Sequence, residues 1–365
     1  MNYDLIFLAS GKDFHAIDWY RNIQTVSPDL NCIYVTDLIS SENEPALLTN
    51  VDRVFRLFII DKLLFKKRSK IGDKWRNIIK LLFFPIQALK LRQIINNNKK
   101  VIIHAHTMYY TFLCWTLGLN YISSPQGSEV LVRPFKSKLY KYFLTLALKG
   151  AESIIIDSQN INDEIYKLTG KKSFEIQYGI DVQAILDKNY KSKLRNRITS
   201  IRGLYPLYRI DEILKARNNC KEIINLTLFY PFHNDIYKKR VFKKLIPGDC
   251  DYGRLPKKQM IYDVLFESLL VISIPISDSS PRSVAEAIFC GTCVAVTYSR
   301  WTDTLPACMR ERVVIINIDD PKWLESAIEK AKVITQHFYI PSKEALAKFD
   351  QLETMKIVSK KFYIK

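Results

Sequence analysis

The sequence predicts an α/β fold built from two parallel β-sheets, each joined by crossover helices. Short apolar runs alternate with helix-length segments along the whole chain, which is the pattern that parallel sheets leave in a sequence. At 365 residues, 48% of them hydrophobic, the chain can bury two ordinary cores. A polar, charged stretch at 187–197 separates the two series of runs. We therefore predict two domains with a linker at this stretch.

The predicted strands are the short apolar runs. In the first half they lie at 5–8, 32–35, 53–57, 101–104, 121–123, 153–157 and 174–177. In the second half they lie at 198–201, 224–228, around Leu245, and at 270–274, 293–296 and 313–316. The tail from 342 to 365 reads as helix, and we expect it to pack back on the first domain. The predicted domains are 1–190 together with 342–365, and 191–341.

Composition points to a reduced, cytoplasmic setting. The chain has seven cysteines at irregular positions and no secretory signal, because the apolar run at its N-terminus is short and contains Asp4. Cys290 and Cys293 form a Cys-x-x-Cys without a second pair or nearby histidines, so a metal or redox role is not expected. No stretch reaches the 18 or so apolar residues that span a bilayer, so we expect no membrane crossing.

The positive charge is concentrated in one segment. The net charge is +18, and residues 51–100 hold fourteen Lys or Arg against Asp52, Asp61 and Asp73. Within this region, residues 62–84 interleave cations with bulky apolar side chains, which suits an anionic membrane surface. A solvated basic face over a core helix is the other interpretation. Nucleic acid is not an expected partner, because no nucleic-acid recognition motif is visible.

The stretch from Leu269 to Gly291 carries the strongest functional signal. An apolar run that reads as a buried strand leads through a tight polar loop into a short helix, for which Gly291 provides a left-handed end. Free backbone N–H groups around Ser280 to Ser283 and the positive end of the helix dipole would face a phosphate. The carboxylates of Asp278 and Glu286 can accept hydrogen bonds from sugar hydroxyls. This combination predicts a nucleotide-sugar site.

Several motifs then resemble one family in order and spacing. Asp278 and Glu286 match the Glu-x7-Glu pattern, in its variant with Asp first, of the retaining GT-B glycosyltransferases of family 4 (glycosyl transferases group 1), which includes many bacterial polysaccharide and O-antigen enzymes. The further matching stretches are 11–19, 104–106, 126–129, 177–181 and 200–208. The resemblance extends from about residue 5 to about residue 335.

This resemblance implies two Rossmann-like domains facing a central cleft, with acceptor in the first and nucleotide sugar in the second. It implies catalytic roles for Asp278, Arg202, His15 and His106. The donor-binding residues it implies are Glu286, Ser279, Ser280, Pro281, Arg282, Ser283, Arg209 and Gln126. Other interpretations are a surface ion pair for Arg202, a solvent-facing carboxylate for Glu286, a turn cap for Asp278 and structural roles for the histidines.

The chain also departs from the family pattern. Tyr208 or Arg209 stands where a phosphate-binding lysine is usual, and Gln126 stands where a cleft histidine is usual. The donor sugar therefore stays open. Asp249-Cys250-Asp251 has the spacing of a metal-binding Asp-x-Asp, but we interpret it as coincidental and expect transfer without a metal or other cofactor.

The predicted function is transfer of a hexose or N-acetylhexosamine from a UDP- or GDP-sugar to a lipid-linked saccharide, in O-antigen or capsule synthesis. The expected location is the inner face of the cell membrane, bound peripherally through segment 62–84. Two alternatives remain: a nucleotide-sugar 2-epimerase of the same fold, and a catalytically silent partner protein with this fold.

Overall fold

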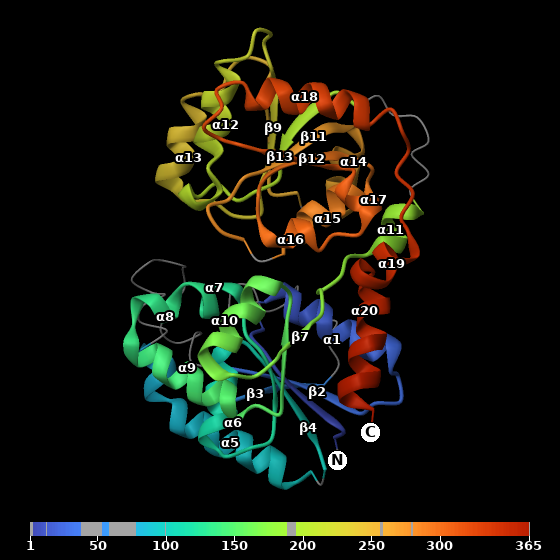
Figure 1. The fold of residues 1–365 in the computed structure, drawn as a ribbon. Helices are drawn as coiled ribbons and strands as arrows, with labels where there is room; N and C mark the ends of the chain where they lie inside the picture. The colour runs from blue at the N-terminus through green and yellow to red at the C-terminus, as the bar shows by residue number, and fades with distance from the viewer. Residues whose placement is uncertain are drawn as a thin grey trace. The chain divides into compact units, whose positions relative to one another are not determined.

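The computed structural model describes residues 3–11, 13–37, 53–57, 78–98, 100–187, 195–255, 258–278 and 280–364. The chain forms two compact units (Figure 1): unit 1 is Met1–Tyr178 with Leu352–Lys365, and unit 2 is Gly179–Gln351. Each unit is a parallel sheet with helices, so the predicted pair of parallel-sheet α/β domains is confirmed. The change of unit after Tyr178 comes earlier than the boundary expected at 190, and residues 342–351 lie in unit 2.

Unit 1 contains a seven-stranded parallel sheet in the order β3-β2-β1-β4-β5-β6-β7. The strands are β1 (Leu5–Leu8), β2 (Cys32–Thr36), β3 (Val54–Arg56), β4 (Ile102–His106), β5 (Ile122–Ser124), β6 (Ser153–Ile156) and β7 (Phe174–Glu175). Every residue of β1 is fully buried, as expected for a parallel strand covered on both faces. The strand order reverses direction between β1 and β4.

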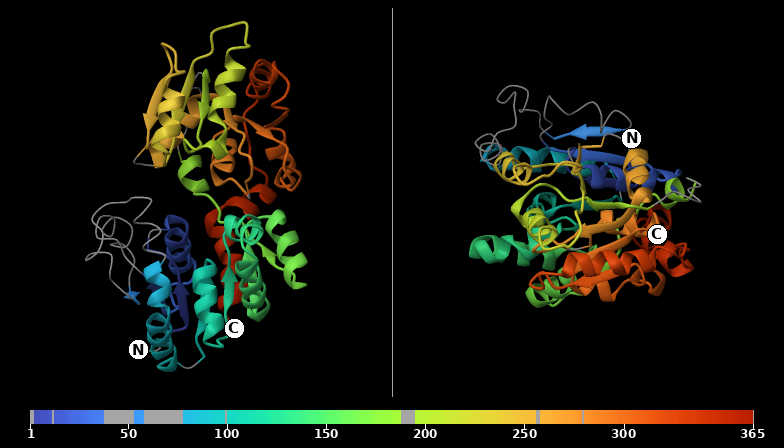
Figure 2. Two further views of the ribbon diagram at one scale, coloured as in Figure 1. Left: turned by 90° about the vertical axis from the view of Figure 1, so that its left-hand side faces the viewer. Right: turned by 90° about the horizontal axis from the view of Figure 1, so that it is seen from above.

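The helices of unit 1 cover both faces of its sheet (Figure 2). They are α1 (Phe14–Val26), α5 (Phe84–Asn96), α6 (Met108–Thr116), α7 (Gly127–Leu131), α8 (Arg133–Lys136), α9 (Lys138–Gly150), α10 (Gln159–Thr169), α20 (Gln351–Val358) and the π-helix η2 (Ser359–Tyr363). Leu5 and Phe7 point to the layer that contains α1, α20 and η2. Ile6 and Leu8 point to the layer of α5, α6, α9 and α10. The alternation of neighbouring strand residues thus builds one core on each face.

Unit 2 contains a six-stranded parallel sheet in the order β10-β9-β8-β11-β12-β13. The strands are β8 (Arg197–Ser200), β9 (Leu226–Phe229), β10 (Cys250–Gly253), β11 (Ser268–Ser273), β12 (Cys293–Thr297) and β13 (Val313–Ile316). The strand predicted around Leu245 is wrong: the chain turns there, and the strand follows at β10. Leu245 is apolar because its side chain packs against the core, and Gly248, with φ of 96°, completes the turn.

The helices of unit 2 are α11 (Val182–Leu186), the 3₁₀-helix η1 (Pro206–Tyr208), α12 (Ile210–Arg217), α13 (Asp235–Phe242), α14 (Lys258–Glu267), α15 (Arg282–Phe289), α16 (Arg300–Asp303), α17 (Ala307–Arg310), α18 (Trp323–Ile334) and α19 (Lys343–Phe349). Gly291 follows α15 with φ of 77°, the left-handed end expected from the sequence. The tail predicted as one helix over 342–365 instead forms α19, α20 and η2. It breaks at Asp350, which is extended and bridges Ile180.

Among the described residues, no helix is both long enough and apolar enough to span a bilayer. Of the basic segment 62–84, residues 62–77 lie outside the described residues, and residues 78–82 are helical and lead into α5.

Candidate functional site

The predicted donor residues of unit 2 gather where its strand order reverses. β8 and β11 are parallel neighbours in the middle of the sheet, and the strands that follow each of them in the chain are added on opposite sides of this pair. Arg202 follows β8, and Asp278 follows β11. In open parallel sheets this edge is where ligands bind, because the loops after the two strands diverge and leave a crevice between them. The topology therefore explains why two residues far apart in sequence meet here.

Arg202 is the centre of this cluster. Its guanidinium forms an ion pair with the Asp278 carboxylate and donates a hydrogen bond to Ser283 Oγ at 3.2 Å. Its Cζ lies 4.8 Å from the ring centroid of Tyr208. The Nε atom is buried and has no hydrogen-bond acceptor among the described residues. The guanidinium is thus held on three sides and is suited to bind anionic oxygens.

The start of α15 lies beside Arg202. Pro281 is the N-cap, and Arg282 and Ser283 are the first helical residues. The first N–H groups of a helix have no partner within it, and they favour an anion together with the helix dipole. Ser280 and Pro281 lie in this loop as predicted, whereas Ser279 is outside the described residues.

Glu286 lies one turn further into α15. The Arg282 guanidinium lies 3.6 Å from its carboxylate, and both side chains are only 14% exposed. Tyr262 of α14 is a neighbour that the sequence did not reveal: burial raises the pKa of its phenol, and the Glu286 carboxylate raises it further. The Tyr262 hydroxyl is buried without a hydrogen-bond partner among the described residues. Glu286 therefore lies in a partly buried setting in which a carboxylate can act as a directed acceptor.

Tyr208 and Arg209 differ in their relation to the cluster. The ring of Tyr208 stacks on Arg202, which favours the charged guanidinium. Arg209 has a left-handed backbone, with φ of 52°, at the N-cap of α12. Within the described part of the chain its side chain makes no hydrogen bond or ion pair with Arg202 or Asp278. Of the two residues at the usual lysine position, only Tyr208 joins the cluster.

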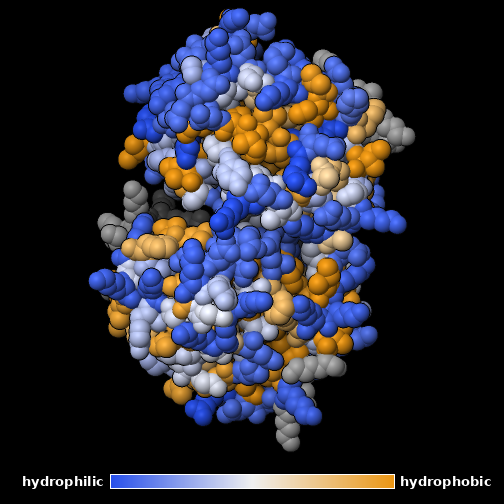
Figure 3. Space-filling model, in the orientation of Figure 1, coloured by the Kyte–Doolittle hydropathy of each residue, from blue (hydrophilic) through white to orange (hydrophobic). Residues whose placement is uncertain are grey.

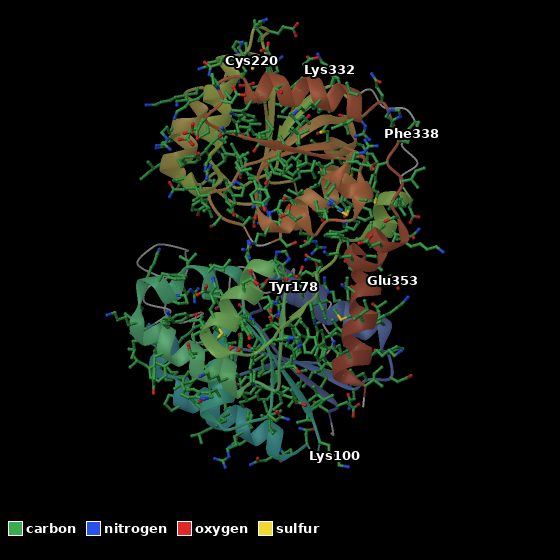
Figure 4. The ribbon with its side chains drawn as sticks, viewed as in Figure 1. Lys100, Tyr178, Cys220, Lys332, Phe338 and Glu353 are labelled. Atoms are coloured by element: carbon green, nitrogen blue, oxygen red, sulfur yellow. The ribbon has the colours of Figure 1, made fainter. Side chains whose placement is uncertain are left out.

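Unit 1 has a second polar cluster at its own reversal of strand order. His106 ends β4, and Asp13 follows β1 and caps α1 by accepting from the His15 and Ala16 amides. The Nε2 atom of His106 lies 2.9 Å from the amide nitrogen of Gln126 and 3.7 Å from the Asp13 carboxylate. Gln126 also donates to the Tyr178 hydroxyl at 3.3 Å. Figure 4 labels Tyr178 in this region.

These contacts indicate a neutral His106. Burial lowers its pKa, and the Asp13 carboxylate opposes that shift. The amide nitrogen of Gln126 lies within hydrogen-bond distance of Nε2 of His106, and a donor at this position favours the neutral imidazole. Nδ1 is buried and has no partner among the described residues. His15 lies against the same cluster, with its ring centroid 5.8 Å from that of Tyr178.

A buried network behind His106 was not predicted from the sequence. The Tyr363 hydroxyl, from η2, accepts a hydrogen bond from Trp19 Nε1 at 3.2 Å and contacts Nδ1 of His104. Nε2 of His104 contacts Ser124 Oγ at 2.7 Å. Burial holds the pKa of His104 well below its usual value. Tyr363 is 259 residues away from His104, and no local motif in the sequence links them.

Asp249 of the Asp-x-Asp has a structural role. It is buried, pairs with Arg217 at 2.6 Å, and accepts from the Leu226 amide at 2.7 Å and the Ile246 amide at 2.9 Å. The described residues include no group of three or more His, Cys, Asp or Glu side chains that could hold a metal ion. Cys290 and Cys293 are buried, free thiols, and burial raises the pKa of Cys293 to about 12.

A hollow of about 1030 Å³ lies at the opposite edge of the unit 2 sheet. It is lined by residues at the amino ends of β8 and β11 and by α18, and Figure 4 labels Cys220, Lys332 and Phe338 among them. None of the predicted donor residues lines it. The cluster of predicted donor residues around Arg202, Asp278, Ser283 and Glu286 is thus separate from this hollow.

Comparison with known proteins supports the same fold. Residues 5–158 match the family described as Glycosyl transferase 4-like. No curated protein matches the sequence. The chain is similar to the structure of HepE from Anabaena in complex with UDP, with 14% identity and a TM-score of 0.72 over 99% of each chain. HepE has also been solved with UDP-glucose.

Two other enzymes have similar structures. Sucrose-phosphate synthase from Thermosynechococcus elongatus is 13% identical with a TM-score of 0.67, over 99% of this chain and 98% of that one. The lipopolysaccharide outer core galactosyltransferase WaaB is 12% identical with a TM-score of 0.65, over 97% and 98%. Residues 5–158 in unit 1 thus match a glycosyl transferase 4-like family, and the whole chain has the two-sheet fold seen in GT-B glycosyltransferase structures.

Proposed function

We propose that the protein is a retaining glycosyltransferase that moves a hexose or N-acetylhexosamine from a UDP- or GDP-sugar to a lipid-linked saccharide, in the synthesis of a cell-surface polysaccharide such as O-antigen or capsule. The observation that carries this proposal is the joining of Arg202, Asp278, Ser283 and the start of α15 at the strand reversal of unit 2. The structures of HepE with UDP and UDP-glucose support the choice of donor.

In the proposed reaction, Arg202 neutralises the charge that builds on the leaving diphosphate as the anomeric bond breaks. The N–H groups at the start of α15 add to this field. Glu286 binds the ribose hydroxyls as an ionised acceptor, and Asp278 accepts hydrogen bonds from the donor sugar. In the proposed retaining course, the acceptor hydroxyl approaches on the face of the leaving group, whose phosphate oxygen takes its proton. His15 and His106 are proposed to act in catalysis, and Gln126 is proposed to bind the donor.

We further propose that no metal is needed. A metal bound by the Asp-x-Asp would need the Asp249 carboxylate as a ligand. That carboxylate instead pairs with Arg217 and accepts hydrogen bonds from two backbone amides. The positive charge would come instead from Arg202 and α15. Activity should therefore persist in EDTA. Loss of activity in EDTA with recovery on adding Mn²⁺ would contradict this part of the proposal.

The acceptor and the location belong to the same proposal. A lipid-linked saccharide would be met at the inner face of the cell membrane, with the protein bound peripherally. The basic composition of segment 62–84 supports this, and so does the match to a lipopolysaccharide galactosyltransferase.

The test is a transfer assay with radiolabelled UDP- and GDP-sugars and a bacterial lipid extract. We expect label in the organic phase with one donor, and loss of about a hundredfold in rate for Arg202→Ala. Incubation with donor alone separates the alternatives: an epimerase would convert the sugar nucleotide, whereas a transferase would give at most slow hydrolysis. No binding of any donor would favour a silent partner protein.

A further inference from the structure

The charge of unit 1 is more one-sided than its composition suggests. Between Asp73 and Glu152 the only acidic residue is Glu129, whereas this interval contains twelve Lys or Arg. Glu129 is only 5% exposed and accepts hydrogen bonds from the Met108 and Gln126 amides. The helices of this interval therefore present cations to solvent with no exposed acidic side chain among them.

Three of these helices form one continuous layer. Phe84, the first residue of α5, stacks edge-on against Tyr109 of α6, with ring centroids 6.1 Å apart. On the other side of α6, Phe112 meets Tyr140 at 6.0 Å, and Trp115 meets Phe143 at 6.1 Å. The left panel of Figure 2 shows the segment leading into α5, then α6 and α9, side by side toward the viewer.

Large apolar side chains project from this layer. Each of the following is at least 60% exposed: Leu81, Leu82, Leu89, Phe135, Leu139 and Tyr142. Figure 3 shows hydrophobic residues reaching the surface between charged ones along the edge of unit 1 that carries α8 and α9. A group of exposed apolar side chains of this size marks a binding surface, because a surface that contacts only solvent rarely gathers so many.

Cations stand between these apolar residues. Lys136 ends α8, and Lys138 and Lys141 lie in the first turn of α9. All three are exposed, and none forms an ion pair with a described residue. They alternate with Phe135, Leu139 and Tyr142. A surface helix with aromatic side chains and lysines of this arrangement can insert its apolar groups at a bilayer interface while the lysines meet anionic headgroups.

We propose that the face formed by α8, α9 and residues 78–89 docks on an anionic lipid bilayer. A second copy of the chain is a poorer occupant, because a symmetric contact would bring the same lysines together. The inference deepens the proposed function and rests on it for the lipid-linked acceptor. It also moves the membrane contact from segment 62–84 toward helices that follow it.

The test is vesicle flotation of the full chain, with phosphatidylcholine alone and with about 30% phosphatidylglycerol added. The variant K136E/K138E/K141E removes the cations, and acidic residues in the first turn of α9 are compatible with the helix dipole. We expect its partition onto anionic vesicles to fall by about a hundredfold or more, since each cation near the surface contributes about 1 kcal/mol. A matched control, K239E/K243E/K244E at α13, changes the charge equally and should bind like the wild type.

The apolar part is tested by Phe135→Ser with Tyr142→Ser, which should weaken binding even at high salt. Failure of the wild type to bind anionic vesicles, or equal losses in the two lysine variants, would overturn the proposal. A further result would also overturn it: a wild type that is a dimer and binds no vesicles, and that becomes a monomer when Phe135 and Tyr142 are replaced by Ser. Thermal stabilisation by UDP, measured in parallel, should be unchanged in all of these variants. Vesicle binding without UDP or GDP stabilisation would count against the donor site and leave the docking surface standing.

Discussion

At the scale of single residues, the proposed donor cluster depends on one guanidinium, that of Arg202. The Arg202 guanidinium bonds both to Asp278, in the loop after β11, and to Ser283, in the first turn of α15. It also lies over the ring of Tyr208, a residue at the position where the family usually has a lysine. Arg keeps its charge and its planar set of donors at any physiological pH. A lysine would keep the charge but could not hold the same set of partners at once.

The first prediction concerns this distinction. Arg202→Lys should retain part of the donor affinity, because the charge remains, while the rate of transfer falls by about tenfold or more as the second hydrogen bond is lost. Steady-state kinetics on the donor that proves active would measure both effects. Arg240→Lys, on the exposed face of α13, is the control and should behave like the wild type. Equal kinetics for the two variants would show that Arg202 does not contact the donor.

The second prediction concerns pH. His104 and His106 are buried and have lowered pKa values, so the unfolded chain takes up protons near pH 6.5 that the native chain does not. Stability should thus be constant above about pH 7 and fall below 6.5, by up to about 1.4 kcal/mol per pH unit for each histidine. Urea unfolding at pH 7.5 and 5.5 measures this.

His104→Asn should flatten this dependence, and His337→Asn, at an exposed position, should not. The same pH dependence in the His104 variant as in the wild type would assign the effect to other groups.

At the scale of elements, strand topology explains more than any motif. In both units the first and fourth strands in chain order are neighbours, and the strand order reverses between them. The polar residues that follow these two strands are therefore brought together. Apolar runs sufficed to predict almost every strand, because parallel strands are buried on both faces and leave uninterrupted hydrophobic stretches. Leu245 shows the limit of this method of predicting strands. A short apolar run beside a Pro-Gly turn can pack against the core without forming a strand.

The predicted site residues show a similar limit. Asp278, Ser283 and Glu286 share one loop and helix, so their grouping could be read from spacing. The pairing of Arg202 with them depended on a family resemblance. The contacts of Tyr363 with Trp19 and His104 could not be predicted from the sequence. They join residues that are far apart in the chain and depend only on how the elements of unit 1 pack.

The third prediction uses the two acidic residues of the Asp-x-Asp. Asp249→Asn would leave Arg217 buried without its counter-charge, and should lower the free energy of unfolding by about 3–5 kcal/mol. Asp251→Asn, at an exposed position, should change it by less than about 1 kcal/mol. Chemical denaturation measures both. A large effect of Asp251 together with a small one of Asp249 would contradict the structural role assigned here.

The fourth prediction concerns the C-terminal tail. Tyr363→Phe removes a hydroxyl that contacts both Trp19 and His104 in the core of unit 1, so the unfolding free energy should fall by about 1–3 kcal/mol. Tyr166→Phe, on the exposed side of α10, should be nearly neutral. Thermal unfolding followed by Trp fluorescence compares them. A neutral Tyr363→Phe would mean that the tail holds unit 1 by apolar packing alone.

At the scale of the whole molecule, the two units divide the proposed work. Unit 2 carries the cluster proposed to bind the donor at its strand reversal, and unit 1 carries a buried histidine cluster at its own. The concentration of positive charge on the helices of unit 1 adds the surface proposed to meet the membrane. These features are the basis of the proposal that the protein is a transferase with a soluble donor and an acceptor held in lipid.

The central claim is that unit 2 holds a nucleotide-sugar donor through Arg202 and Glu286, and it is tested most directly by thermal stabilisation with a panel of UDP- and GDP-sugars. A ligand that binds only the native state raises the melting temperature by mass action. We predict stabilisation of the wild type by one nucleotide series, its loss in Glu286→Ala, and its retention in Glu329→Ala on α18, whose side chain is exposed. Stabilisation by no nucleotide sugar, or full retention in Glu286→Ala, would contradict the account.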